Sequence, residues 1–276
     1  MKDLILFGDC RDTLPAFIDK ARCCVTSPPY YGLRNYGDES NQIGQENTPE
    51  EYIQEMVNVF EDVKNILHDD GVLFLNIGDS YYNYRPGKAY VKQTLSKTNQ
   101  DLPTVSPKRS NKLTNYKEKD LIGIPWMLAF ALRSDGWYLR QDIIWHKPNP
   151  MPESVKSRCT KSHEYIFLFS KTKKYYFDHK GIMEDATKQE GLRAKRSVWT
   201  QSADSAPSSE HFATYPRKLI EPCVIAGSPK GGLVLDPFAG LGTTGIVAEN
   251  LGRDSIMIEL SKEYIKEMRK RITKYT

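Results

Sequence analysis

Cysteine is scarce in this sequence, and no apolar run is long enough to cross a bilayer. The 276 residues contain five cysteines, Cys10, Cys23, Cys24, Cys159 and Cys223, an odd number with no Cys-x-x-Cys pair. This pattern excludes a disulfide framework and a zinc site, so we expect reduced, mostly buried thiols. A membrane-spanning helix needs about 20 apolar residues, and the N-terminal apolar stretch is too short for a signal peptide. We therefore expect a soluble, cytoplasmic protein with no membrane partner.

Histidine is also sparse, and its positions do not suggest a metal centre. His146, His163 and His211 lie on different segments, without the spacing of metal ligands. We therefore expect no metal in the site.

The net charge is small, but its distribution along the chain is uneven. The sequence has 39 Lys and Arg against 35 Asp and Glu, a formal charge of +4. Residues 84–117 carry +7, so the remainder of the chain carries −3. The same stretch has no apolar period, which indicates a long loop. Two interpretations stay open, a contact with a phosphate backbone and a solvated linker.

A second polar stretch spans residues 188–209. It places Arg193, Lys195 and Arg196 near Trp199 and ends in a run rich in Ser and Ala. We expect another surface excursion here. Its basic side chains are candidates for reading base edges, although phosphate contact is the more frequent role of a single Arg or Lys.

Short apolar runs alternate with amphipathic helical patterns around these two stretches. This alternation is typical of an α/β fold with a mostly parallel sheet and helices on its faces. The expected strands are residues 4–7, 23–26, 72–77, 233–235 and 255–258, with 138–145 and 165–169 as a hairpin at the sheet edge. The expected helices are residues 49–67, 124–132, 216–226, 243–250 and 261–274.

The first long helix has clear sequence boundaries. Thr48 and Glu51 form a capping-box pattern, and Pro49 suits the first helical turn. The Asp-Asp-Gly sequence at 69–71 is expected to end the helix before the strand at 72–77.

A Gly-x-Gly turn follows the predicted strand at 233–235. Residues 236–244 read Asp-Pro-Phe-Ala-Gly-Leu-Gly-Thr-Thr and run into a helix. Open α/β sheets bind ligands at the carboxyl ends of their strands, where glycines allow close approach and a helix N-terminus offers free N–H groups. The third glycine of a dinucleotide fingerprint is missing, so a tight structural turn is the alternative.

Glu259 ends the next predicted strand. An acid at this position can accept hydrogen bonds from a ribose diol. It can instead serve as an N-terminal acid of the helix that begins at Ser261. We favour the ribose role because of the preceding loop.

A rigid segment follows the strand at 23–26. Ser27-Pro28-Pro29-Tyr30 contains two consecutive prolines, which hold the chain extended just beyond the strand end. The Ser27 hydroxyl and the Tyr30 ring are thereby held in a preset geometry. The alternative is a rigid proline turn with an aromatic lid.

Together, the segments 27–30 and 236–244 resemble the S-adenosylmethionine-dependent amino DNA methyltransferases, the N4-cytosine and N6-adenine family. The catalytic motif precedes the cofactor motif, which is similar to the permuted order called the β class. The resemblance implies a Rossmann-like methyltransferase fold, with a mostly parallel twisted sheet, helices on both faces and permuted motif order. It extends to residues 8–10, 144–149, 163–165 and 211–216.

The resemblance also implies roles for individual residues. The cofactor would be S-adenosylmethionine, its methionine part held by Asp236, Phe238, Gly240, Gly242, Thr243 and Thr244. Asp9 and Cys10 would lie at its adenine, and Glu259 at its ribose.

The target base would be gripped by Ser27, Pro28, Pro29 and Tyr30. We expect the Ser27 hydroxyl and the Pro28 carbonyl to accept hydrogen bonds from an exocyclic amine, whose nitrogen then attacks the sulfonium methyl in line. Tyr30 would stack on a base flipped out of the duplex. In the resembled family, Ser at the first position favours N4 of cytosine, and N6 of adenine is the alternative.

Other chemistries fit the sequence less well. Methylation at a ring carbon needs a cysteine nucleophile, but Cys223, which follows Pro222, lies in an apolar helical stretch and is expected to be a core thiol. A nicotinamide-dependent oxidoreductase would leave the segment 27–30 without a role. A catalytically dead DNA-binding scaffold is disfavoured by the intact Ser27 and Asp236.

The expected organisation places the two motifs in different parts of one core. Residues 1–83 form its catalytic half, 84–118 a basic loop, 119–180 the continuation of the core, 181–210 a target-recognition excursion, and 211–276 the cofactor-binding half. Double-stranded DNA is the implied partner. A homodimer and a cognate restriction endonuclease stay open as further partners.

Overall fold

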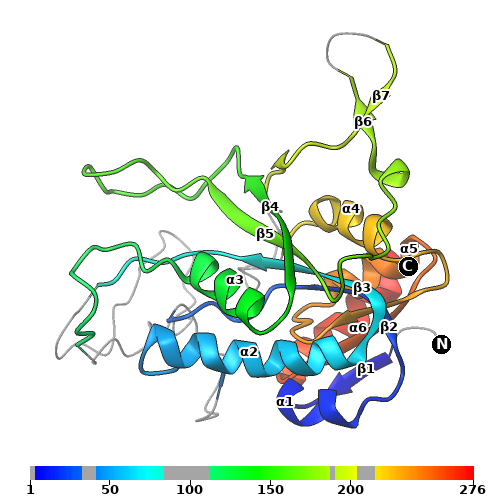
Figure 1. Ribbon diagram of the computed structural model, residues 1–276, viewed down its shortest axis with the longest axis horizontal. Helices are drawn as coiled ribbons and strands as arrows, with labels where there is room; N and C mark the ends of the chain where they lie inside the picture. Colours follow the sequence, from blue (N-terminus) through cyan, green and yellow to red (C-terminus); the bar gives the residue numbers. More distant parts are fainter. Residues whose placement is uncertain (1–3, 33–41, 84–111, 187–189, 204–214) are drawn as a thin grey trace.

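In the part of the chain that the structure describes, eight strands form one sheet, in the order β1-β10-β9-β2-β3-β5-β4-β8 (Figure 1). The structure is a computed structural model and describes residues 4–32, 42–83, 112–186, 190–203 and 215–276. Residues 84–111 of the basic stretch, 187–189 and 204–210 of the predicted excursion at 181–210, and 211–214 lie outside the described residues.

The elements alternate along the chain as an α/β pattern predicts. The strands of the sheet are β1 (Leu4–Phe7), β2 (Ala21–Thr26), β3 (Leu67–Ile77), β4 (Tyr138–His146), β5 (His163–Ser170), β8 (Val198–Thr200), β9 (Leu233–Asp236) and β10 (Asp254–Glu259). A separate hairpin consists of β6 (Glu184–Asp185) and β7 (Leu192–Arg193). The helices are α1 (Cys10–Thr13), α2 (Pro49–Ile66), α3 (Ile124–Ser134), α4 (Arg217–Gly227), α5 (Thr243–Asn250) and α6 (Lys262–Tyr275), with short 3-10 helices η1 (Leu14–Ala16) and η2 (Lys180–Ile182).

All strands of the described sheet except β5 run in the same direction. β1, β10, β9, β2 and β3 pair in parallel, β5 is antiparallel to β3 and β4, and β8 is parallel to β4. The carboxyl ends of β1, β10, β9, β2, β3 and β4 therefore lie together, beside the amino end of β5. We call this side the carboxyl end of the sheet.

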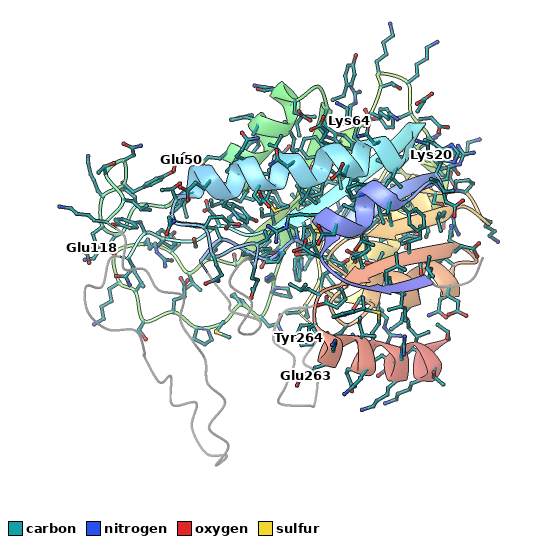
Figure 2. The ribbon with its side chains drawn as sticks, turned by 90° about the horizontal axis from the view of Figure 1, so that it is seen from below. Lys20, Glu50, Lys64, Glu118, Glu263 and Tyr264 are labelled. Carbon is teal, nitrogen blue, oxygen red and sulfur yellow. The ribbon has the colours of Figure 1, made fainter. Side chains whose placement is uncertain are left out.

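Helices cover both faces of the sheet. α1, α2 and α3 pack on one face, and α4, α5 and α6 pack on the other. Figure 2 shows α2, marked near its ends by Glu50 and Lys64, on the opposite side of the sheet from α6, where Glu263 is labelled. In the described ranges, no helix is long and apolar enough to cross a membrane.

The cysteines illustrate how the sheet separates two hydrophobic clusters. Cys24 faces the cluster under α2 and α3, whereas Cys23 and Cys223 belong to the cluster under α4. Successive residues of a strand point to opposite faces, so both clusters are filled from β2. All five cysteines are free and all but Cys159 are buried, as expected from the sequence.

The start of α2 is confirmed, but its predicted end is wrong. The capping box of Thr48 and Glu51 is present. The helix ends at Ile66, and β3 begins directly at Leu67 rather than at residue 72. Ala21 pairs with Leu67 and Cys23 with Val72, so a bulge accommodates the residues 69–71 inside the strand. The Asp-Asp-Gly sequence interrupts the pairing of β3 and does not stop the helix.

The pairing of β4 with β5 is confirmed, but the hairpin is not at the edge of the sheet. β8 adds to the outer side of β4, with Trp199 opposite Trp145. The Trp199 side chain is buried, and its indole N–H donates to the Arg196 carbonyl at 2.6 Å. The second polar stretch is therefore only partly a surface excursion, because its one tryptophan packs in the buried cluster that also contains Trp145.

Candidate active site

The segments predicted to bind ligands all lie at the carboxyl end of the sheet. Asp9 follows β1, Glu259 ends β10, Asp236 ends β9 and Ser27 follows β2. Because these four strands are neighbours and parallel, their ends form a continuous row. The sequence separates Ser27 from Asp236 by more than two hundred residues, and the sheet order brings them together.

Asp236 is a buried hub of hydrogen bonds within the chain. Its Oδ1 accepts from the Thr26 hydroxyl at 2.7 Å and from the Phe238 backbone N–H at 3.1 Å. Its Oδ2 accepts from the Tyr215 phenol at 3.1 Å and from the Thr244 hydroxyl at 2.5 Å. The residue is 1% exposed, and burial raises the pKa of its carboxyl. Asp236 therefore holds the loop after β9 against the end of β2.

Tyr215 is a site residue that was not predicted individually. It lies just before α4 and is buried. Its phenol donates to Asp236, and its oxygen lies 2.5 Å from the Thr244 hydroxyl. The sequence signal was the similarity of the segment 211–216 to a family segment, which gave no reason to select the tyrosine. Its partners are 21 and 29 residues further along the chain.

The two glycines of the turn have different surroundings. Gly240 has φ +53°, and a Cβ added there would meet no described atom within 4 Å. Gly242 has φ +74°, but a Cβ there would lie 2.4 Å from Met268 Cγ of α6. Gly240 therefore leaves its backbone open to a ligand, whereas Gly242 is needed for packing.

Thr243 supplies an unused polar group beside this turn. It is the first residue of α5 and is 3% exposed. Its Oγ1 is buried and has no hydrogen-bond partner among the described residues. A buried hydroxyl without a partner is costly, so a polar ligand at this helix start would satisfy it. The turn and Thr243 thus fit a cofactor with a polar tail.

Glu259 links β10 to the turn and to α6. Its Oε2 accepts from the Gly240 backbone N–H at 2.8 Å, and its Oε1 accepts from the Ser261 backbone N–H at 2.7 Å. Each carboxylate oxygen retains a second lone pair for a further donor. Burial raises the pKa of Glu259 to about 7. Glu259 therefore binds the backbone at the start of α6, and its carboxylate can still accept a hydrogen bond from a ribose hydroxyl.

Asp9 and Cys10 lie at the start of α1, at the far end of the same row. Asp9 accepts from the Arg11 backbone N–H at 2.9 Å and forms an ion pair with the Arg11 guanidinium. Arg11 also binds Glu55 of α2 at 2.7 Å. The Cys10 side chain is buried, and burial raises the pKa of its thiol. These contacts fix the bend after β1.

A hydrogen bond from α2 holds the segment 27–30 in place. The Tyr52 phenol, from a fully buried residue, donates to the Pro29 carbonyl at 2.9 Å. In the part of the chain that the structure describes, no hydrogen bond of the loops uses the Pro28 carbonyl. Pro29 is therefore a fixed point of the loop, and Pro28 keeps an acceptor for a ligand.

Tyr30 is fixed at both its ring and its hydroxyl. A Cβ added at Gly78 would lie 2.7 Å from Tyr30 Cε2, so the ring packs on the backbone after β3. The phenol donates to Glu164 Oε2 at 2.7 Å and lies 3.3 Å from Asn76 Oδ1. Lys147 forms an ion pair with Glu164. Burial, followed by the negative charge of Glu164, raises the pKa of Tyr30.

Glu164, Lys147 and Asn76 were not predicted as site residues. Glu164 and Lys147 lie in the segments 163–165 and 144–149, which resemble family segments, but no charge pattern singled them out. They come together because β3, β5 and β4 are adjacent in the sheet.

The described part of the second excursion carries paired charges. Arg193 and Arg196 both bind Glu184, at 3.1 Å and 2.7 Å, and Lys195 lies over the Trp199 ring. Figure 1 shows the β6–β7 hairpin extending away from the sheet. The Arg196 side chain remains 64% exposed despite its ion pair, so its guanidinium can still meet a phosphate.

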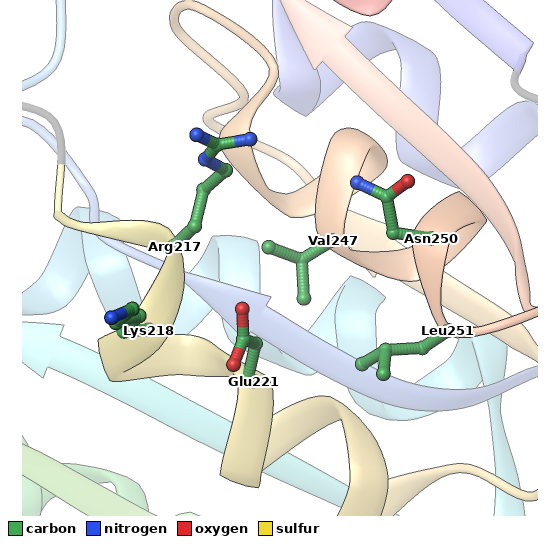
Figure 3. Close-up of a pocket in the computed structure, with 6 residues that line it drawn as sticks. All are labelled: Arg217, Lys218, Glu221, Val247, Asn250 and Leu251. Carbon is green, nitrogen blue, oxygen red and sulfur yellow. The ribbon is translucent and has the colours of Figure 1, made fainter. Parts of the chain in front are cut away.

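A separate pocket lies between α4 and α5 (Figure 3). It is lined by Arg217, Lys218, Glu221, Val247, Asn250 and Leu251. None of the predicted site residues borders it. The pocket is therefore distinct from the row of loops at the carboxyl end.

Comparisons with known proteins show which family the sequence resembles. The profile of a family described as DNA methylase matches residues 21–270. The chain is 47% identical over 270 residues to the Type II methyltransferase M.SmaI of Serratia marcescens, covering 97% of this chain and 90% of that protein. It is 46% identical over 246 residues to the Type II methyltransferase M.Cfr9I of Citrobacter freundii, covering 88% and 78%.

Solved structures share the fold over almost the whole chain. The PvuII DNA methyltransferase, described as cytosine-N4-specific, matches with a TM-score of 0.70 at 19% identity, covering 100% of this chain and 91% of that one. M1.HpyAVI in complex with S-adenosylmethionine matches with a TM-score of 0.58 at 18% identity, covering 98% of both chains.

Proposed function

The chain belongs to the family of N6/N4 DNA methylases, and we propose that it transfers a methyl group to N4 of cytosine at a specific site in double-stranded DNA. The Rossmann-like methyltransferase fold and the cofactor S-adenosylmethionine, both expected from the sequence, are confirmed. N6 of adenine is the alternative target.

The observation that carries the cytosine proposal is the residue at the start of the catalytic loop. Ser27 offers a neutral hydroxyl, and the adjacent Pro28 carbonyl has no partner in the described loops. Two neutral acceptors suit the two hydrogens of an exocyclic amine, which cytosine and adenine both carry. The choice of cytosine rests on Ser27 itself, because Ser at this position favours N4 of cytosine in the resembled family. The structural neighbour described as cytosine-N4-specific supports the same choice.

The chemistry of the loop follows from the electronic structure of such an amine. Its lone pair is delocalised into the ring, which makes the nitrogen a poor nucleophile. Hydrogen bonds to Ser27 and Pro28 draw the nitrogen toward a tetrahedral geometry and localise the lone pair. The Tyr30 ring holds the flipped base by stacking on it. Solvent takes the proton that the amine loses.

The cofactor is held by the neighbouring loops. When bound, S-adenosylmethionine supplies the electrophilic methyl group on its sulfonium. The turn at Gly240, where a Cβ would meet no described atom, and the unused hydroxyl of Thr243 would hold its amino-acid part. Glu259 would accept hydrogen bonds from the ribose, and Asp9 and Cys10 would line the adenine.

DNA contact is assigned to the basic segments. The basic stretch at 84–118 would contact phosphates, and the excursion at 181–210 would contact the target sequence, with Arg193, Lys195 and Arg196 as candidates. The relatives are named as Type II methyltransferases, which supports a place in a restriction–modification system.

The test is to incubate the protein with S-adenosylmethionine and mixed-sequence duplex DNA, digest the DNA to nucleosides and identify methylated bases by mass spectrometry. We expect N4-methylcytosine. A duplex of only A·T pairs is the matched control and should stay unmethylated. N6-methyladenine instead would overturn the choice of base, and the absence of both products would overturn the proposed activity.

A further inference from the structure

A chain of hydrogen bonds runs from Ser27 through Tyr30 to Glu164. The Ser27 hydroxyl donates to the Tyr30 phenol oxygen at 3.4 Å, and the phenol donates to Glu164 Oε2 at 2.7 Å. Lys147 Nζ binds the other carboxylate oxygen of Glu164. The first contact is long, as catalytic hydrogen bonds often are before a substrate binds. We call these three links the relay.

The direction of the relay is set at its charged end. An ionised carboxylate can only accept hydrogen bonds, so the single phenol proton of Tyr30 is donated toward Glu164. The phenol oxygen is then left to accept from Ser27. A phenol is protonated at neutral pH, as this arrangement requires, and burial raises the pKa of Tyr30 further.

Asn76 supports the same direction. Its amide nitrogen donates to the Tyr165 carbonyl at 3.0 Å, which fixes the amide so that its oxygen faces Tyr30 at 3.3 Å. Both groups beside the phenol, the amide oxygen and the Glu164 carboxylate, are thus acceptors. Neither can donate to the phenol and reverse the relay.

The position of the Ser27 proton matters for the proposed reaction. A hydroxyl carries one proton and two lone pairs, and only the lone pairs can accept from an amine. A proton directed at the target amine would oppose that contact. With the proton committed to Tyr30, the lone pairs of Ser27 are left for the substrate.

We propose that Glu164, held by Lys147, is a positioning residue that fixes Ser27 as the hydrogen-bond acceptor for the target amine. This inference rests on the proposed function. Glu164 acts without touching the substrate, across 134 residues of sequence, through the Tyr30 hydroxyl. The packing of the Tyr30 ring on Gly78 keeps that hydroxyl from swinging away.

The test is a double-mutant cycle on a duplex that the wild type methylates. Glu164→Gln and Tyr30→Phe are compared singly and together, with kcat measured at saturating cofactor and DNA. We expect each single variant to lower kcat by about tenfold or more. Tyr30→Phe removes the hydrogen bond to a charged group, and Glu164→Gln replaces the carboxylate, which can only accept, with an amide that can also donate. KM for cofactor and DNA should stay within about twofold. The double variant should be no slower than Tyr30→Phe, because the relay is already broken there.

A matched control removes an ion-paired carboxylate at the other end of the same sheet. Asp70 of β3 binds Arg22 of β2 at 3.0 Å, near the amino end of the sheet. Asp70→Asn should keep the wild-type kcat. Thermal unfolding and cofactor binding verify that each variant is folded.

The outcomes separate this inference from the proposed function. A wild-type kcat in Glu164→Gln or Tyr30→Phe, or losses that multiply in the double variant, would overturn the relay. Tyr30→Phe keeps the ring and its packing, so it decides the question even if Glu164→Gln does not fold. A wild-type protein that methylates no base would overturn the proposed function instead.

Discussion

The cofactor side and the base side of the carboxyl end use the same residue types in different ways. On the cofactor side, formed by the ends of β1, β10 and β9, each carboxylate binds at least one backbone N–H group of its loop. Asp9 accepts from the N–H of Arg11, Asp236 from that of Phe238, and Glu259 from those of Gly240 and Ser261. On the base side, formed by β2, β3, β4 and β5, side chains bind one another, as Tyr30 binds Glu164.

This difference predicts which substitutions should lower affinity and stability and which should lower the rate of methyl transfer. A carboxylate that binds backbone N–H groups fixes the path of a loop, so its loss should reduce affinity and stability. A contact between side chains fixes an acceptor or a proton and leaves the backbone in place, so its loss should reduce the rate. The separation of affinity from rate can be tested one residue at a time.

The largest effect is expected at Ser27. Ser27→Ala removes an acceptor for the target amine, and methyl transfer should fall by about 100-fold or more, the scale seen when one preorganised hydrogen bond to a transition state is lost. Cofactor affinity, measured by calorimetry, should change little because Ser27 lies on the base side. Wild-type turnover in this variant would contradict the amine contact.

The next effect is expected at Asp236, where the two sides meet. Asp236→Asn places an N–H₂ group where the carboxylate accepts four hydrogen bonds. The free energy of unfolding should fall by about 3 kcal/mol. Cofactor affinity should fall by roughly tenfold as the loop after β9 shifts. Tyr215→Phe, which removes one of the four donors, should lose only about 1 kcal/mol in denaturant titrations. Equal losses in both variants would contradict the hub role.

A smaller and purely kinetic effect is expected at Gly78. Gly78→Ala puts a Cβ 2.7 Å from the Tyr30 ring, which displaces the ring and should lower kcat by roughly tenfold. In a Tyr30→Ala background the same substitution should add no further loss, because the ring is gone. An undiminished second loss would mean that Gly78 acts through something other than Tyr30.

The smallest effect is a pH dependence at Glu259. Burial raises its pKa from 4.5 to about 7, so folding favours the protonated form. That contribution to stability is complete below about pH 4.5 and is lost as the pH rises through about 7. We expect the melting temperature of the wild type to fall between these pH values as the pH increases, whereas that of Glu259→Gln should not fall for this reason. Parallel curves would contradict the raised pKa.

The affinity of the wild type for the cofactor should move in the opposite direction. The ionised carboxylate is the better acceptor for ribose hydroxyls, so affinity should rise with pH through about 7. Glu259→Gln should show no such rise. This opposite sign separates a ribose contact from a role limited to the helix start.

Much of the fold could be predicted because its signals are local. Strand and helix patterns, the capping box at Thr48 and the loops at 27–30 and 236–244 lie within short stretches of sequence. The wrong predictions, the end of α2 and the edge of the sheet, concern features that depend on how the strands pair. The bulge at 69–71 depends on the register of β3 against β2, and the edge position of β8 depends on Trp199 reaching a core cluster.

The sequence predicted which residues lie at the site better than it predicted what each of them binds. The sequence marked Asp236 as a cofactor residue, and the structure shows its carboxylate bound to other residues of the chain. Gly242 was marked as a cofactor residue too, and its backbone packs on Met268. A motif specifies which residues lie near a ligand, but the partners of each atom come from distant segments.

The sequence by itself determined the alternation of strands and helices, the order of the two motifs and the chemical types available at each loop. Only the tertiary structure decided which groups the side chains of these loops bind. Thr26 and Asp236 meet across 210 residues and Tyr30 and Glu164 across 134, because the sheet places β9 beside β2 and β5 beside β3. Hydrogen bonds act over about 3 Å, so the order of strands in space, which no local pattern encodes, fixes how these side chains work.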